Sequence, residues 1–264
     1  MKRAVIVLVR NPLLSLWDFF AELGSLTKFT YAAVLSALLP PYKRSITRRQ
    51  MDAIGVGSIP IVVMTGLFMG LVLALQAIVE LRNLGATTMM GRPVGTTVVR
   101  ELGPVLTAMM VAARCGSAIT AELASMAISE QLDALRAEGS DPIKKLVEPR
   151  LVACTVMMPI LTILCIGVAF LGAWVVAARD IKLNSHFYWN SVLEVLKPEF
   201  LWGGLFKAVC FGFLVGVIAC YTGMNTKLGS AEVGRSTTQT VVIASILILA
   251  SDFLITKFLT VFWW

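Results

Sequence analysis

Long apolar runs separated by polar, often basic, connectors dominate this sequence. A helix that crosses a bilayer needs about 20 mostly apolar residues. Five runs meet that requirement: residues 53–79, 102–128, 151–178, 208–226 and 236 to the C-terminus. The first, third and fourth carry no charge, whereas the second contains Arg114 and Glu122 and the last contains Asp252 and Lys257. The pattern predicts an all-α integral membrane protein with about five transmembrane helices.

The region before the first run has a two-sided pattern. A helix there would present one apolar and one polar face, formed by Leu13, Leu16, Trp17, Phe20 and Leu23 and by Ser15, Asp18, Glu22 and Ser25. Such a helix suits the membrane interface, and the apolar stretch 29–39 is too short to span. We expect an interfacial amphipathic region over residues 1–50 and a five-helix domain over residues 51–264. If the N-terminal region crossed the membrane, the chain would have six spans.

Composition and charge agree with a membrane location. Hydrophobic residues make up 57% of the chain, against about 45–50% in soluble domains. The net charge is +7, and basic residues cluster in alternate connectors: Lys43, Arg44, Arg48 and Arg49, then Arg136, Lys144, Lys145 and Arg150, then Lys227 and Arg235. Because basic loops favour the cytoplasm, we expect these connectors and the N-terminus there, and residues 82–100 and 179–207 on the other side. No basic stripe is interleaved with aromatic residues, so nucleic-acid binding is not expected.

Few residues could support catalysis or metal binding. His186 has no ligand partner nearby in sequence, and the chain lacks the G-x-x-x-x-G-K-[ST] loop of ATPases. No Ser/His/Asp or paired-carboxylate arrangement is evident. The cysteines lie in apolar runs without a CxxC pair, as is typical of small buried hydrophobes: Cys115, Cys154, Cys165, Cys210 and Cys220. We expect no catalytic residue, metal or cofactor in this chain.

Ionisable residues inside the second run need partners. Arg114 and Glu122 are two helical turns apart, about 12 Å by helix rise, so they cannot pair with each other. Each needs a group on another helix, a backbone atom or water. They either lock the bundle together or take a direct part in transport, and the sequence leaves both open.

Arg100 and Glu101 lie just before the second run and are followed by Gly103 and Pro104. Pro104 fits the first turn of a helix, which predicts that Arg100 and Glu101 lie at the helix start near the membrane surface. A phosphate there would meet Arg100 and the free N–H groups of the helix N-terminus. The alternative is an Arg–Glu surface pair worth about 0–1 kcal/mol.

The connector after the second run predicts a short polar helix. Residues 129–137 place Leu132 and Leu135 on one face, and Gly139 follows where a C-terminus would be capped. Asp141 and Pro142 then suit the start of a second short element. Such a helix can dock in a groove of a soluble partner, or it is simply part of a surface loop.

Five motifs occur in order between residues 101 and 150: ELGP, ARCGSAITAE, EQLDAL, GSDP and PR. In register, they resemble the signature of the MlaE/YrbE permease family of MCE-associated ABC lipid transporters. The resemblance extends over most of the chain, including Gln76 and the stretch 235–238. Departures from the family pattern are Cys115, Ala127 and Glu138.

The resemblance implies a non-catalytic permease that moves phospholipid between a bacterial inner membrane and an MCE protein, helping to maintain outer-membrane lipid asymmetry. The implied partners are a second copy of the chain, ABC ATPase subunits that bind ATP and Mg, an MCE-protein ring and a small STAS-domain subunit. Coupling to the ATPase would fall to Glu130, Gln131, Leu132, Asp133 and Leu135. A lipid cavity at the dimer interface, between the first, second and fifth spans, would include Leu73, Ala77, Leu81, Leu84, Arg100 and Glu101. For the four apolar residues, ordinary packing is an equal alternative.

Two other classes of function remain as rivals. An ion-driven secondary transporter of a hydrophobic substrate would use Arg114, Glu122 and Asp252 as a relay, but a short chain without evident repeats disfavours it. A membrane-embedded enzyme acting on lipid is disfavoured by the missing metal or nucleophile constellation.

Overall fold

A computed structural model describes residues 12–38, 44–83, 85–226 and 229–262, with the backbone alone for residues 12–19, Thr87 and Phe262. Its described residues are helical or lie in turns, without a strand, which confirms the all-α class. The α-helices are α2 (Pro12–Leu38), α3 (Arg44–Asn83), α4 (Gly91–Thr97), α5 (Gly103–Val111), α6 (Ser117–Ile128), α7 (Gln131–Ala137), α8 (Glu148–Asp180), α9 (Ser185–Leu193), α10 (Pro198–Met224) and α11 (Ser230–Phe262). The described part also contains a 3₁₀ turn, η1 (Thr87–Met89), and three π turns, η2 (Val98–Leu102), η3 (Ala112–Gly116) and η4 (Ile143–Val147).

Within the described residues, five helical segments are long and apolar enough to cross a membrane: Arg44–Asn83, Gly91–Ile128, Ile143–Asp180, Pro198–Met224 and Ser230–Val261. This confirms the predicted number of spans. All five segments begin about 6 to 11 residues earlier than expected, because each helix already includes polar or charged residues that precede its apolar run. The connectors expected at 82–100 and 179–207 are correspondingly shorter.

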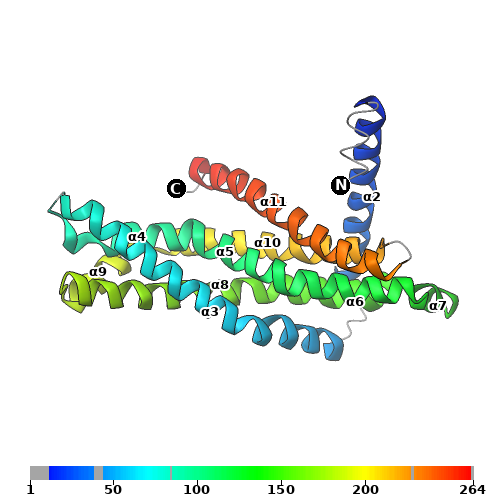
Figure 1. Cartoon of the computed structure of the whole chain (residues 1–264), viewed down its shortest axis with the longest axis horizontal. Coiled ribbons are helices and arrows are strands. Elements are labelled where there is room, and N and C mark those ends of the chain that lie inside the picture. The colour runs from blue at the N-terminus through cyan, green and yellow to red at the C-terminus, as the bar shows by residue number, and fades with distance from the viewer. Residues whose placement is uncertain (1–11, 39–43, 84, 227–228, 263–264) are drawn as a thin grey trace.

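The spanning helices form an elongated bundle (Figure 1). Helices α3, α8 and α10 and the α4–α6 segment run along its long axis, with α4 and α9 at one end and α7 at the other. We call these the α9 end and the α7 end. Helix α11 starts near the α7 end, packs on α10 and α6, and then diverges from the bundle toward the C-terminus.

Glycines bring α3 and α8 into close contact. A Cβ atom at Gly66 would lie 2.7 Å from the carbonyl oxygen of Cys165, and one at Gly70 would overlap the carbonyl oxygen of Ala169. From the other side, a Cβ at Gly172 would lie 2.7 Å from the carbonyl oxygen of Leu67. Small residues that let backbones approach are the usual means by which membrane helices pack, since lipid supplies no hydrophobic drive between helices.

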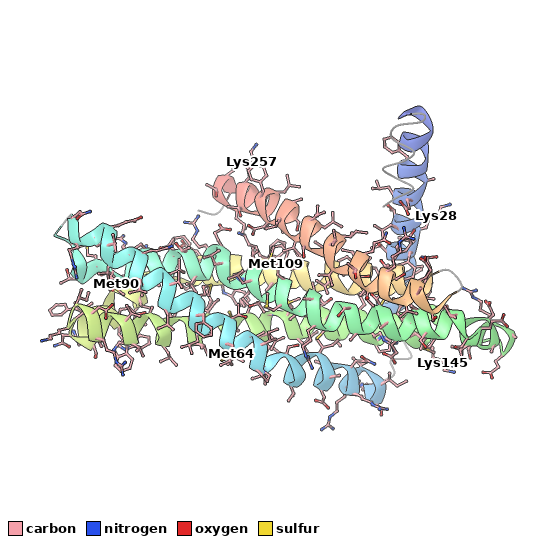
Figure 2. All side chains as sticks on the ribbon, in the orientation of Figure 1. Lys28, Met64, Met90, Met109, Lys145 and Lys257 are labelled. Atoms are coloured by element: carbon pink, nitrogen blue, oxygen red, sulfur yellow. The ribbon has the colours of Figure 1, made fainter. Side chains whose placement is uncertain are left out.

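The bundle exposes apolar side chains along its length, as expected where hydrocarbon is the solvent. Exposed positions on α3 include Val72, Leu75 and Val79, and on α11 they include Ile246 and Phe253. Lys257 projects away from the bundle on α11 (Figure 2). The aromatic connector is divided: Phe187 and Trp202 are exposed, whereas Tyr188 is buried and donates a hydrogen bond to the Phe170 carbonyl at 3.0 Å.

Helix α2 lies crosswise to the bundle near the α7 end (Figure 1). Phe29 packs edge-on against Tyr221 with ring centroids 5.5 Å apart, and the Ser25 hydroxyl is hydrogen-bonded to the Tyr221 hydroxyl. Phe20 and Leu23 are exposed, while the side chains of Leu13, Leu16 and Trp17 lie outside the described part. The helix is not among the five span candidates. Its place in the membrane interface stays a prediction.

The loop at the α7 end has the caps that its sequence indicates. Gly139 adopts a positive φ of 72°, and the Asp141 carboxylate accepts the Ile143 N–H at 2.9 Å. The expected boundaries were wrong in two respects. Helix α7 begins at Gln131 because Glu130 is left-handed, with φ of 58°. The element that Asp141 caps is not a separate helix but the first turn of the third span.

Candidate functional site

A buried lysine on α10 is surrounded by acceptors from two other helical segments, η2 and α11. Lys207 is fully buried, and its Nζ donates to Glu101 Oε2 at 2.5 Å, Thr256 Oγ1 at 2.7 Å and the Arg100 carbonyl at 2.9 Å. Asp252 Oδ1 on α11 forms a second ion pair with Nζ at 2.9 Å. We call these residues the Lys207 cluster. It joins η2, α10 and α11.

The local backbone explains how Lys207 finds a carbonyl to bind. Pro104 has no N–H to donate to the Arg100 carbonyl four residues earlier, and the chain forms the π turn η2 over these residues. The carbonyl of Arg100 therefore has capacity for Lys207 Nζ. Pro104 in the second span thus leaves free a carbonyl that helps to bind the Lys207 ammonium of the fourth span.

The cluster contains more negative than positive charge. One ammonium faces two carboxylates, and the Glu101 and Asp252 side chains are 33% and 19% exposed. A lysine taken out of water is tolerated only when it is paired and hydrogen-bonded. The Arg100 guanidinium lies over the Phe200 ring, 5.1 Å from the centroid, in a cation–π arrangement.

The expected position of Arg100 and Glu101 at a helix start was wrong. Gly91–Ile128 is one helical segment that already runs through them, and the Gly103 N–H donates to the Val98 carbonyl. No free helix N-terminus is present there to meet a phosphate. Glu101 pairs with Lys207, so the alternative of a local Arg–Glu surface pair does not describe its contacts either.

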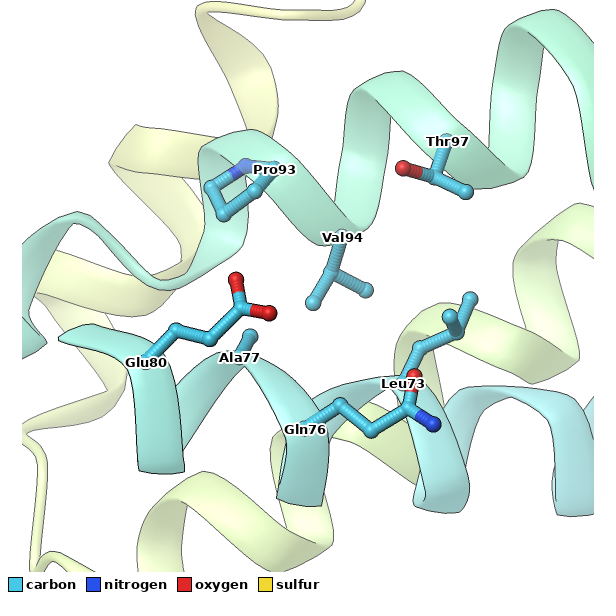
Figure 3. Close-up of a pocket in the computed structure, with 7 residues that line it drawn as sticks. All are labelled: Leu73, Gln76, Ala77, Glu80, Pro93, Val94 and Thr97. Carbon is cyan, nitrogen blue, oxygen red and sulfur yellow. The ribbon is translucent and has the colours of Figure 1, made fainter.

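A second feature is a hollow of about 140 Å³ between α3 and α4, which we call the α3–α4 hollow. Figure 3 shows the Glu80 carboxylate extending from α3 toward Pro93 and Val94. The hollow is lined by Leu73, Gln76, Ala77, Glu80, Pro93, Val94 and Thr97. It combines apolar walls with three polar side chains.

The structure divides the residues that we expected to line one lipid cavity. Leu73 and Ala77 line the α3–α4 hollow. Leu81 is half-buried against the core, and Leu84 lies outside the described residues. Arg100 and Glu101 belong with the Lys207 cluster, one helical turn beyond Thr97. Whether they share one cavity in a dimer stays a prediction.

Arg114 and Glu122 each have a partner on another helix. Arg114 Nη1 donates to Ser58 Oγ at 2.9 Å and reaches toward the Ala53 carbonyl at 3.5 Å, crossing over Gly57 of α3. Glu122 Oε1 pairs at 2.7 Å with Arg150, whose side chain is almost completely buried at the start of α8. These contacts favour a role in holding helices together.

The predicted coupling residues lie at the α7 end. Glu130, Gln131 and Asp133 are exposed, Leu132 is buried and Leu135 is half-buried. Asp133 pairs with Arg136 at 2.7 Å. A polar surface held by one buried leucine is suited to docking a partner.

Sequence reasoning missed the centre of the Lys207 cluster. Lys207 was placed in a connector because the apolar run appears to begin after it, and Thr256 carried no signal. A lysine flanked by Phe206 and Ala208, with Asp252 as the one acidic residue of the last apolar run, was the available sign. Glu80 was missed because it falls just past the uncharged run. Among the described residues, no group of three or more His, Cys, Asp or Glu side chains could hold a metal.

The fold and the paired charges inside it define an all-helical protein that spans a membrane with five helices. Comparison with known proteins identifies the family to which this membrane protein belongs. The sequence model described as permease MlaE matches residues 47–258, and the chain belongs to this family. It is an ABC transporter permease.

Three relatives show how far the similarity extends. A probable ABC transporter permease protein of Rickettsia conorii is 41% identical over 90% of this chain and 92% of its own length. The intermembrane phospholipid transport system permease protein MlaE of Haemophilus influenzae is 35% identical over 90% of this chain and 92% of its own length. The chloroplastic protein trigalactosyldiacylglycerol 1 of Arabidopsis thaliana is 33% identical over 80% of this chain and 61% of its own length.

Proposed function

We propose that this permease moves phospholipid between a bacterial inner membrane and an MCE protein, and so helps to maintain outer-membrane lipid asymmetry. The observation that carries the proposal is the near full-length similarity to a permease named for intermembrane phospholipid transport. The α3–α4 hollow supports it, since its apolar walls suit acyl chains and its polar residues suit a headgroup.

The proposed assembly contains two copies of this chain, ABC ATPase subunits that bind ATP and Mg, an MCE-protein ring and a small STAS-domain subunit. The exposed apolar face of α11 is available for a second copy or for lipid. ATP hydrolysis by the ATPase subunits would be coupled to transport at the α7 end. There Glu130, Gln131 and Asp133 present an exposed polar surface.

The proposed orientation places the α7 end and the N-terminus in the cytoplasm. Basic residues lie at the start of α3 and in the loop at the α7 end: Arg44, Arg48, Arg49 and Arg136 are exposed, and Lys144 and Lys145 are half-buried, with Lys145 visible in Figure 2. Cytoplasmic ends of spanning helices are enriched in such residues. The α9 end would then face the MCE ring.

Reconstitution tests the function. The permease, co-purified with its ATPase and MCE partners, is placed in proteoliposomes with a fluorescent phospholipid, and transfer to MCE protein or acceptor vesicles is followed. We expect transfer to require ATP and Mg. Transfer driven by an ion gradient without ATP would favour a secondary transporter and contradict the proposal.

A charge-reversal variant tests the proposed coupling surface at the α7 end. Glu130→Lys reverses the charge of the exposed surface at the α7 end, so we expect ATP-driven transfer to fall about tenfold or more, as for the loss of a contact worth about 1.4 kcal/mol. Glu199→Lys, an exposed glutamate at the start of α10, is the matched control and should transport normally. Normal transfer by Glu130→Lys would show that coupling lies elsewhere.

A further inference from the structure

The α3–α4 hollow contains one ionisable side chain, Glu80. The other lining residues are apolar, apart from Gln76 and Thr97. Within the part of the chain that the structure describes, no ion pair or side-chain hydrogen bond involves Glu80. Its carboxylate points across the hollow toward α4 (Figure 3). The hollow therefore has an exposed carboxyl group with no cation beside it among the described residues.

The surroundings of Glu80 indicate which kind of molecule meets it. Val72, Leu75 and Val79 on the same helix are 51%, 48% and 67% exposed. No charged residue precedes Glu80 on α3 after Asp52. An exposed apolar surface in a spanning helix is in contact with lipid. Glu80 lies at the α9 end of that surface, where headgroups begin.

We propose that the α3–α4 hollow binds the primary ammonium of an aminoalkyl phospholipid headgroup such as phosphoethanolamine, with Glu80 as the specificity-determining residue. This rests on the proposed phospholipid transport. A primary ammonium donates charge-assisted hydrogen bonds to a carboxylate, which the quaternary ammonium of choline cannot do. Gln76 and Thr97 supply hydrogen bonds to headgroup oxygens.

Size and charge agree with this ligand. The hollow has a volume of about 140 Å³, well above the roughly 10–15 Å³ that a single water molecule needs. It therefore has room for a group of several heavy atoms, such as an ethanolamine unit. The Glu80 carboxylate supplies the charge opposite to that of the ammonium.

The test measures which lipid the intact complex retains. The permease–ATPase–MCE complex is equilibrated with vesicles of equal phosphatidylethanolamine and phosphatidylglycerol content, repurified, and its bound lipids are quantified by mass spectrometry. We expect Glu80→Gln to lower the ratio of bound phosphatidylethanolamine to phosphatidylglycerol about fivefold and Glu80→Lys to lower it further. Glu194→Gln, an exposed glutamate at the same end of the bundle, is the matched control and should leave the ratio unchanged.

The remaining outcomes separate the hypotheses. Soluble phosphoethanolamine should not displace the lipid; if it does, the hollow binds the free headgroup and the lipid assignment is overturned. An unchanged ratio in Glu80→Gln overturns the inference while phospholipid transport stands. Loss of MCE binding with an unchanged ratio would mean that Glu80 binds a basic side chain of the partner instead. A wild-type complex that retains no phospholipid would refute the proposed function itself.

Discussion

Lys207 places a positive charge inside the bundle with no exposed side-chain surface. Three hydrogen bonds and a second carboxylate surround its Nζ. Removing one partner from a buried pair costs more than the pair itself contributes, because the remaining charge loses its compensation. The two carboxylates that face Lys207 are the groups that would be left.

Lys207→Met should therefore destabilise the permease by roughly 3 kcal/mol, the scale of a broken buried pair. Glu101 and Asp252 would then face each other as like charges. Adding Glu101→Gln and Asp252→Asn to Lys207→Met should restore much of the loss. The fraction of monodisperse protein after heating in detergent measures both effects.

Lys197→Met is the control, since Lys197 is exposed just before α10. It should leave stability unchanged. Equal stability of wild type and Lys207→Met would show that the lysine is not held as a buried ion. A triple variant no more stable than Lys207→Met would show that the carboxylates contribute no repulsion.

At this scale the sequence showed which residues were unusual but not what they contact. Charges inside apolar runs predicted that Arg114 and Glu122 need partners on other helices. The partners Ser58 and Arg150 could not be named, because contacts between helices depend on rotation and register that one helix does not encode. The same holds for Glu101 and Lys207.

At the scale of elements, the close contact between α3 and α8 depends on glycines, which have no side chain. Gly70→Ala should destabilise the bundle by about 1–3 kcal/mol, the usual cost of overpacking, because its Cβ would overlap the Ala169 carbonyl of α8. Gly167→Ala is the matched control on α8, with nothing within 4 Å of its Cβ. It should be neutral or up to about 1 kcal/mol stabilising.

Thermal stability in detergent and yield in the membrane fraction compare the two glycine variants. If Gly70→Ala were as stable as Gly167→Ala, α3 and α8 would have to separate locally at little cost. The close contact would then not be required for the bundle.

Apolar runs predicted that these elements exist more reliably than where they end. Helices α4 and α10 begin before the apolar runs because ion pairs and a π turn carry the helix past Arg100 and Lys207. Caps were predicted better, since Gly139 and Asp141 act through local geometry alone. The α3–α4 hollow could not be predicted, because it arises between two elements.

For the whole molecule, the prediction concerns which side each end faces. In a variant cleared of the native cysteines, single cysteines at positions 5, 45 and 129 should react with an impermeant reagent from the cytoplasmic side. A cysteine at position 185, in α9, should react from the other side. The reason is the set of basic residues at the start of α3 and in the loop at the α7 end.

Labelling in inside-out and right-side-out vesicles checks this arrangement. Reaction of positions 5 and 45 from opposite sides would mean that the N-terminal region crosses the membrane, giving six spans. Reaction of positions 129 and 185 from the same side would contradict the bundle as a transmembrane unit.

The Lys207 cluster also bears on how the chain is inserted during synthesis. Glu101 precedes Lys207 along the chain, and Asp252 follows it. A lysine entering the membrane costs up to about 2.5–3.5 kcal/mol, but the nascent second span already offers Glu101 when α10 emerges. The growing protein is therefore electrically balanced before its last helix exists. In the Glu101→Gln variant, the Lys207 ammonium would have no carboxylate partner when α10 enters the membrane. Its first such partner would be Asp252, which is synthesised later, in α11.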